Sequence, residues 1–341
     1  MESGAESGAV GQDPRMEQRP KGFDDEDVRS ALSHHHGIDA RELRYRPVGF
    51  GDYHWAVTGA DGSRWFAKIS DLTDKPQCGH TPAAALDGYR AALRTAAELR
   101  AAGLEFVLAP VPPGGGEIVT DLDGRWALAV FEHVDAPAQE FHTELSPGGR
   151  DAVLALLARL HAAAAPAVTP RHSPTVPDRN LIEEALAEQE VSWSGGPFSE
   201  PARQAVVTHA NAIRARLAEA DALTHQLTTS GRPAVVTHGE PHPGNLLDVG
   251  EGYLLIDWDT VGLGVPERDL AVVSDDPAEL AAYTELTGVR PDPVALELYG
   301  LRWTLADLGE FLRWFRAPHS DDADSRTAWE GLLQTLAALD R

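Results

Sequence analysis

The chain has 341 residues, a length that suits one large or two moderate domains. It carries 29 Lys and Arg against 53 Asp and Glu, so its formal net charge is −24. This balance excludes a general nucleic-acid binder, because neutralising phosphates needs surplus Lys and Arg. An acidic surface promotes solubility, and it also suits a cationic or a metal-bridged anionic substrate.

The composition predicts a folded protein of a reducing compartment. Hydrophobic residues make up 43% of the chain, enough for a substantial core. The single cysteine, Cys78, excludes an internal disulfide and a thiolate zinc site. No apolar run approaches the roughly 20 residues of a membrane span, and the N-terminus lacks a signal-peptide pattern. We therefore expect a cytoplasmic protein with no membrane partner.

The N-terminal third predicts a tail, a helix and a small sheet. Residues 1–22 are rich in Gly, Ser, Glu and Pro, which predicts a disordered tail. Asp24 or Asp25 can cap a short helix that ends near His36. From Glu42 the pattern changes to three strands of an antiparallel meander, with a glycine-rich turn after the first and a hairpin signal between the last two.

A helix over residues 83–102 and two further strands, around 106–109 and 126–131, would complete a five-strand sheet with one helix. Beyond about residue 135 helices dominate, interrupted by a strand pair around the string THGEPHPGN; the expected helices cover residues 148–165, 178–190, 199–229 and much of the chain from Glu267. The order predicts an α+β chain with a small sheet-rich lobe (23–135) followed by a larger, mainly helical lobe (136–341).

The stretch that indicates chemistry is VVTHGEPHPGNLLDVGEGYLLIDWD, residues 235–259. Asn245 follows Glu240 by five residues, and Asp257 ends the next apolar strand. One carboxylate can orient a hydroxyl nucleophile and accept its proton, while an amide oxygen and a second carboxylate are hard ligands for the Mg²⁺ that bridges phosphates. The spacing therefore indicates phosphoryl transfer.

The strings HGxxHxxN and IDWD resemble the aminoglycoside phosphotransferase family of kinase-like enzymes, and the order of elements is similar over roughly residues 42–316. The resemblance implies a bilobal, protein-kinase-like fold and a cleft between the lobes. It also implies roles in the catalytic loop, which are the catalytic carboxylate for Glu240, Mg²⁺ ligation for Asn245 and Asp257, support of the catalytic turn for His238, and bracing of that loop for Asp269.

One position departs from the family pattern, which usually has aspartate where this chain has Glu240. The longer side chain displaces the carboxylate, and a displacement near 1 Å can cost on the order of a hundredfold in rate when positioning dominates. A loop stiffened by Pro241 and Pro243 could compensate for it. We expect an active enzyme because both metal-ligand positions are intact.

The nucleotide side of the resemblance falls in the first lobe. Lys68 in WFAKI matches the family lysine that holds the α- and β-phosphates of ATP or GTP. Gly49 and Gly51 occupy the place of the phosphate-covering loop, although a simple turn would also use two glycines.

The lysine needs an acidic partner from the helix at residues 83–102, for which Glu98 is the candidate and Asp87 the other available carboxylate. Residues 131–134 match the connection between the lobes, where backbone groups of Glu132 and Val134 would bind a purine edge.

The resemblance also implies that the acceptor binds in the second lobe. Acidic side chains could bind an amine-rich sugar and tryptophans could stack on it; the candidates are Glu267, Asp307, Glu310, Asp321, Asp322, Trp303, Trp314 and Trp329. The expected activity is ATP-dependent phosphorylation of a hydroxyl on a small molecule, foremost an aminoglycoside-like antibiotic. A metabolic kinase for an amino alcohol, sugar or homoserine-like acceptor and a nucleotide-binding protein without transfer activity are the alternatives.

Overall fold

The computed structural model describes residues 19–341 except residues 21, 49–50, 113–116, 137–138 and 142. Most of the predicted tail, residues 1–22, lies outside the described residues. The described chain divides into two units. The first, here called the sheet-bearing unit, consists of Arg19–Thr175 and Asp221–Gly300, and the second, the helical unit, of Val176–Ala220 and Leu301–Arg341. The predicted border between two lobes near residue 135 stays a prediction.

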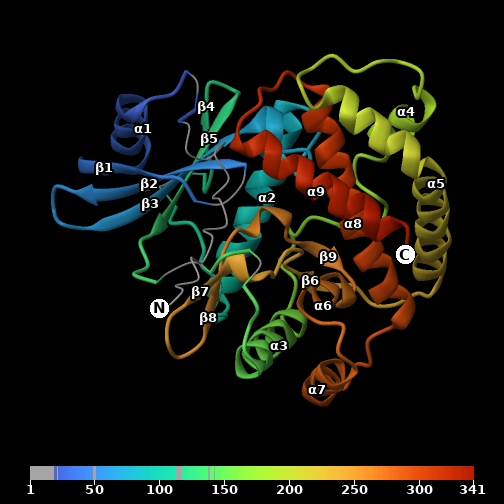
Figure 1. Cartoon of the computed structure of the whole chain (residues 1–341). Helices are drawn as coiled ribbons and strands as arrows, with labels where there is room; N and C mark the ends of the chain where they lie inside the picture. Colours follow the sequence, from blue (N-terminus) through green and yellow to red (C-terminus); the bar gives the residue numbers. More distant parts are fainter. Residues whose placement is uncertain (1–18, 21, 49–50, 113–116, 137–138, 142) are drawn as a thin grey trace, which may run out of the picture. The chain divides into compact units, whose positions relative to one another are not determined.

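The sheet-bearing unit holds all the described strands and most of the short helices (Figure 1). Its elements are α1 (Asp25–His36), β1 (Ala40–Arg46), β2 (Asp52–Gly59), β3 (Arg64–Asp71), η1 (Leu72–Asp74), α2 (Pro82–Ala101), β4 (Thr120–Leu122), β5 (Trp126–Glu132), α3 (Pro147–His161), β6 (Val235–Thr237), η2 (Pro243–Asn245), β7 (Leu246–Asp248), β8 (Tyr253–Leu255), η3 (Trp258–Thr260), β9 (Gly262–Gly264), α6 (Glu267–Val273) and α7 (Pro277–Thr287).

The helical unit is built from α4 (Arg179–Ala187), α9 (Ala323–Leu339) and the larger parts of α5 (Ser199–Thr229) and α8 (Pro293–Arg316). The predicted helices therefore occur close to their expected bounds. Asp24 caps α1 as expected, since its side chain accepts hydrogen bonds from the backbone N–H groups of Glu26 and Asp27.

The predicted five-strand antiparallel sheet is confirmed, with the order β1-β2-β3-β5-β4. One predicted strand is wrong, because residues 106–109 form no strand and the fourth strand is β4 instead. Prolines at 110 and 112 remove backbone donors next to that segment, which a strand interior would need. The segment instead makes single bridges, from Val107 to Leu255 and from Pro110 to Phe131.

The alternation of the strands gives the sheet two different faces. One face packs against α1 through Trp55 and Val57 of β2 and through Ala67 and Ile69 of β3. The residues between them point to the opposite face, which packs against α2 through Ala127 and Ala129 of β5. Lys68, in register with Ala129, therefore lies on the α2 face, where it is buried.

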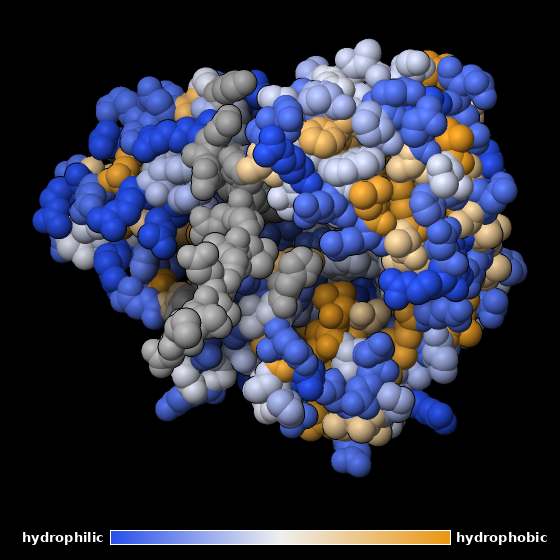
Figure 2. Space-filling model, in the orientation of Figure 1, coloured by the Kyte–Doolittle hydropathy of each residue, from blue (hydrophilic) through white to orange (hydrophobic). Residues whose placement is uncertain are grey.

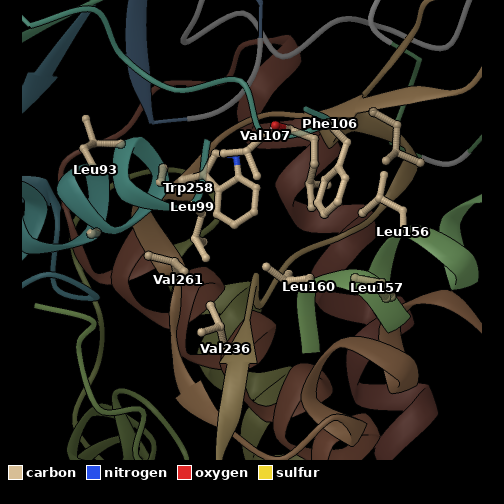
Figure 3. Close-up of a cluster of buried hydrophobic side chains, with 14 of the residues drawn as sticks. Leu93, Leu99, Phe106, Val107, Leu156, Leu157, Leu160, Val236, Trp258 and Val261 are labelled. Atoms are coloured by element: carbon tan, nitrogen blue, oxygen red, sulfur yellow. The ribbon is translucent and has the colours of Figure 1, made fainter. Parts of the chain in front are cut away.

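A continuous hydrophobic core holds the segment with the string IDWD, residues 256–259, in place (Figure 3). Trp258 is 1% exposed and packs in this core, which Leu93 and Leu99 of α2 and Leu157 of α3 also line. Its indole N–H donates to the Leu255 carbonyl oxygen at 2.8 Å. The buried indole therefore fixes the backbone of the two aspartates that flank it, Asp257 and Asp259.

The string THGEPHPGN is flanked by strands, as predicted, but each pairs with a strand later in the chain. β6 pairs with β9 and β7 with β8, all antiparallel. The β7–β8 hairpin is the more important pair for the site, because it joins the end of the loop at Asn245 to the approach to Asp257.

The surface agrees with the composition. Hydrophilic residues dominate the face drawn in Figure 2, with hydrophobic patches among them. Among the described residues, no helix combines the length and hydropathy that a membrane span requires.

Candidate active site

Lys68 is the cation at the centre of the site. Its ammonium lies 2.5 Å from Asp257 Oδ1 and 2.6 Å from Asp52 Oδ2, and its side chain is 8% exposed. Burial alone would lower the pKa of the amine, but the carboxylates of Asp257 and Asp52 raise it well above its usual value. Lys68 therefore remains an ammonium.

The backbone at Asp257 is strained in a way often seen at functional sites. Its φ of 62° and ψ of 67° lie in the left-handed region, which costs a non-glycine residue free energy. Burial and the neighbouring Asp259 carboxylate raise the pKa of Asp257, and Lys68 opposes the shift. The conformation places a carboxylate, one third exposed, directly beside the lysine.

The loop between β6 and η2 is held by a buried carboxylate. Asp269 Oδ2 accepts from the backbone N–H of His238 at 2.8 Å, and Asp269 Oδ1 from that of Gly239 at 2.6 Å. His161 Nε2 lies 3.0 Å from Oδ2. Burial alone would raise the pKa of Asp269, but the His161 hydrogen bond and nearby charges hold it below its usual range. Asp269 thus makes the contact with this loop that the resemblance implied.

Gly239 is required at its position for two reasons. Its φ is +103°, a conformation that L side chains rarely adopt, and a Cβ there would lie 2.2 Å from Arg268 Nη2. The Arg268 guanidinium is itself buried and donates to Thr237 Oγ1 and to the Thr260 carbonyl oxygen, both at 2.7 Å. The loop is therefore packed tightly against α6.

His238 supports the loop through both ring nitrogens. Its Nε2 is 2.9 Å from the Ile256 carbonyl oxygen, and its Nδ1 accepts from the backbone N–H of Glu240 at 3.2 Å. An imidazole that donates at one nitrogen and accepts at the other is neutral. Burial lowers the pKa of His238 to about 4, against the Asp269 charge, which agrees with the neutral form. The histidine ties the loop to the end of the β7–β8 hairpin.

Asn245 precedes the first strand of that hairpin and Asp257 follows the second, so antiparallel pairing of the backbone brings the two residues close. The Ile256 N–H donates to the Asn245 carbonyl oxygen at 3.0 Å. The Asn245 amide Nδ2 donates to the Glu240 carbonyl oxygen at 2.9 Å and lies 3.2 Å from His242 Nε2. Because the nitrogen is engaged in this way, the amide oxygen is the atom left for a cation. Glu240 itself is half-buried.

The donor set fits a hard divalent cation. Oxygen ligands are what Mg²⁺ prefers, and Asn245 and Asp257 supply an amide and a carboxylate oxygen. A second grouping of carboxylate oxygens, from Asp52, Asp257 and Asp259, lies within 4.8 Å of one another. Two of these three carboxylates are paired with a buried second lysine, Lys75, so Asp257 is the one best placed to exchange its lysine for a metal.

Among the residues that the structure describes, the others predicted to bind the nucleotide make no ion pair with Lys68. Gly51 has a φ of +88°, as a turn glycine would, whereas Gly49 lies outside the described residues. Glu132 ends β5 opposite Trp65, and Val134, two residues further on, is half-buried. Glu98 is exposed on α2, and Lys68 pairs with Asp52 and Asp257 instead. The expected pair between Lys68 and Glu98 is therefore absent.

Several acceptor candidates have structural contacts instead. Glu267 is fully buried and pairs with Arg232 at 2.6 Å. Asp322 caps α9, and Trp329 packs against Phe198. Burial and the charge of Glu310 raise the pKa of Asp307 on α8 to about 7.

Sequence reasoning missed the groups that neutralise and brace the site, which are Asp52, Lys75, Asp259, His161 and Arg268. Asp52 carried a usable signal: with His54 it is a polar residue in alternation with apolar ones on β2. Lys75 and His161 carried no such signal, because no neighbouring residue in the sequence indicates which carboxylate each of them contacts.

Known proteins resemble this chain over most of its length. A model of the phosphotransferase enzyme family matches residues 42–300. Protein StrN of Streptomyces griseus is 29% identical over 305 residues, which is 86% of each chain.

Among solved structures, the spectinomycin phosphotransferase APH(9)-Ia in complex with ADP and spectinomycin superposes with a TM-score of 0.70 at 15% identity, over 94% of this chain and 99% of its own. An amicoumacin kinase, hAmiN, gives 0.60 at 14% identity over 93% and 94%, and the Plasmodium vivax ethanolamine kinase 0.58 at 11% over 90% and 86%. The fold is thus kinase-like, and with the match over residues 42–300 the chain belongs to the phosphotransferase enzyme family.

Proposed function

We propose that this protein transfers the γ-phosphoryl group of ATP or GTP to a hydroxyl of a small, cationic acceptor. The observation that carries the proposal is the contact of Lys68 with Asp257 at 2.5 Å, two residues 189 positions apart in the chain. One is the family's phosphate-binding lysine and the other its metal-binding carboxylate. Their contact fits a single crevice for a triphosphate and its cation.

In the proposed reaction the acceptor oxygen attacks the γ-phosphorus. A new oxygen–phosphorus bond forms, the bond to the β–γ bridging oxygen breaks, and the nucleoside diphosphate leaves. Glu240 orients the hydroxyl and accepts its proton, while Lys68 holds the α- and β-phosphates. The side-chain oxygens of Asn245 and Asp257 would hold Mg²⁺, which would supply positive charge against the phosphates when bound.

The loop contacts support this assignment of Glu240. Its backbone N–H donates to His238 and its carbonyl oxygen accepts from Asn245, so its backbone is fixed on both sides. Preorganisation of this kind is what a positioning mechanism needs. It offers a physical reason why glutamate could serve where the family usually has aspartate.

For the acceptor we favour an aminoglycoside-like antibiotic. The net charge of −24 suits a polycation, and one structural neighbour is a phosphotransferase for spectinomycin. The alternative, an amino alcohol, is supported by the likeness to an ethanolamine kinase. Both classes pair a hydroxyl with an amine. We place such an enzyme in the cytoplasm, where its nucleotide is available.

The proposal is tested by incubating the purified protein with Mg-ATP and a panel of aminoglycosides, spectinomycin and amino alcohols, and following ADP release. We expect acceptor-dependent release that Asp257→Ala abolishes. Expression in a susceptible host separates the two acceptor classes, because only an antibiotic kinase raises tolerance. Nucleotide binding with no phosphorylated product from any acceptor would instead favour a protein that binds the nucleotide without transferring phosphate.

A further inference from the structure

A second buried lysine lies beside the predicted one and has no role in the reaction proposed above. The ammonium of Lys75 is 2.7 Å from Asp259 Oδ2 and 3.0 Å from Asp52 Oδ2, and its side chain is 3% exposed. Gln77 Nε2 also donates to Asp259 Oδ2, at 3.1 Å. Burying an ammonium is costly unless carboxylates surround it, so this lysine is a built part of the fold.

Asp52 is the carboxylate that the two lysines share. Its Oδ2 lies 2.6 Å from Lys68 Nζ as well as 3.0 Å from Lys75 Nζ. Asp52 opposes Ser70 in the antiparallel register of β2 and β3, so Lys68, two residues before Ser70, is its diagonal neighbour on the same face of the sheet. Burial alone would raise the pKa of Asp52, but the charges of the two lysines hold it far below its usual range.

Helix α2 offers these lysines an aromatic ring instead of an acid. Asp87 and Glu98, the two carboxylates on α2, are both exposed. Tyr89 faces the ammonium groups, its ring centre 5.8 Å from Lys68 Nζ and 5.1 Å from Lys75 Nζ. This helix therefore contributes a cation–π contact, and the acid comes from β2.

We propose that Asp52 is the positioning residue that holds Lys68 for the nucleotide phosphates, and that Lys75 anchors Asp52 by linking it to Asp259. The inference rests on the proposed function. Lys68 can exchange Asp257 for a phosphate while Asp52 keeps hold of its ammonium. Lys75 keeps Asp52 paired throughout, so no buried carboxylate is left uncompensated during the exchange.

The test is calorimetric titration of the purified protein with Mg-ADP, which reads nucleotide affinity without turnover. Asp52→Asn should weaken ADP binding about 10- to 100-fold, the range expected for the loss of a charge-assisted contact. In turnover assays the KM for nucleotide should rise while the KM for acceptor stays within about twofold, a split that general destabilisation would not produce. The matched control is Asp71→Asn, since Asp71 ends β3 and pairs with the exposed Arg125.

Asp52→Asn removes the negative charge that the ammonium groups of Lys68 and Lys75 share, and this loss could prevent folding. The double variant Asp52→Asn/Lys75→Met removes one charge of each sign and should bind ADP as weakly as Asp52→Asn. Wild-type affinity in either variant overturns the inference and leaves the proposed function intact. Loss of affinity in Glu98→Gln but not in Asp52→Asn would return the role to α2 and also overturn it. Failure of the wild-type chain to bind Mg-ADP would instead sink the proposed function itself, and this inference with it.

Discussion

The buried carboxylate of Asp269 offers the sharpest test of how the loop is held. Asp269→Asn keeps the size of the side chain but replaces one oxygen by an NH₂ group. The carboxylate accepts three hydrogen bonds, from His238 N, Gly239 N and His161 Nε2. The amide oxygen of asparagine can replace only one of the two carboxylate oxygens as an acceptor. The new NH₂ group takes the place of the other oxygen and then faces a buried N–H donor.

The cost of Asp269→Asn follows from these contacts. A hydrogen bond to a charged acceptor contributes about 1.5–3 kcal/mol, and a buried donor left without a partner costs about 1–3 kcal/mol more. We expect a loss of about 3–5 kcal/mol in the free energy of unfolding, measured by urea denaturation. The control, Asp121→Asn, changes an exposed carboxylate of β4 that accepts from Gly124 N at 2.8 Å, and should cost less than about 1 kcal/mol. A loss that small in Asp269→Asn would refute the role assigned to this carboxylate.

Three further predictions concern the same loop and Asp257, the proposed metal ligand. Asp257→Asn should leave the protein folded but lower kcat by about 10²–10³-fold or more, measured as ADP release, because the cation loses a charged ligand. Gly239→Ala should destabilise the fold by about 2–4 kcal/mol in urea, whereas Gly250→Ala, whose φ is also positive (+82°) but whose Cβ would meet nothing within 4 Å, should cost about 1 kcal/mol. Because burial lowers the pKa of His238 from 6.5 to about 4, the unfolded chain takes up this proton first, and the stability that the histidine contributes should be lost as pH falls from 6.5 to 4. Across this pH range the wild-type protein should therefore lose about 3 kcal/mol more than His238→Gln in urea unfolding, since other buried histidines such as His54, whose pKa is also lowered to about 4, titrate in both proteins.

The sequence predicted most of the elements because their signals are local. The cap at Asp24, the alternation of β3 and the length of α5 are each visible within a short window. The misplaced fourth strand had only a short apolar segment to support it. What stabilises that segment is its bridge to Leu255, nearly 150 residues later, which no local pattern reveals.

The site divides in the same way. Glu240, Asn245 and Asp257 lie in one stretch of chain, so their spacing alone indicated phosphoryl transfer. The partner of Lys68 was sought on α2, where the resemblance implied it. Asp52 of β2 pairs with Lys68 instead, because the register between β2 and β3 brings the two side chains together. Such a pairing depends on which strands are neighbours, and a single sequence does not show that for one carboxylate among 53 acidic residues.

The most direct test of the account is mass analysis of the acceptor after incubation with Mg-ATP and the wild-type protein or Glu240→Gln. We expect the wild-type product to carry one added phosphoryl group, formed about 10²–10⁴-fold more slowly by Glu240→Gln while that variant binds Mg-ADP normally. Equal rates of product formation by the two proteins would contradict the claim that this carboxylate receives the proton of the attacking hydroxyl.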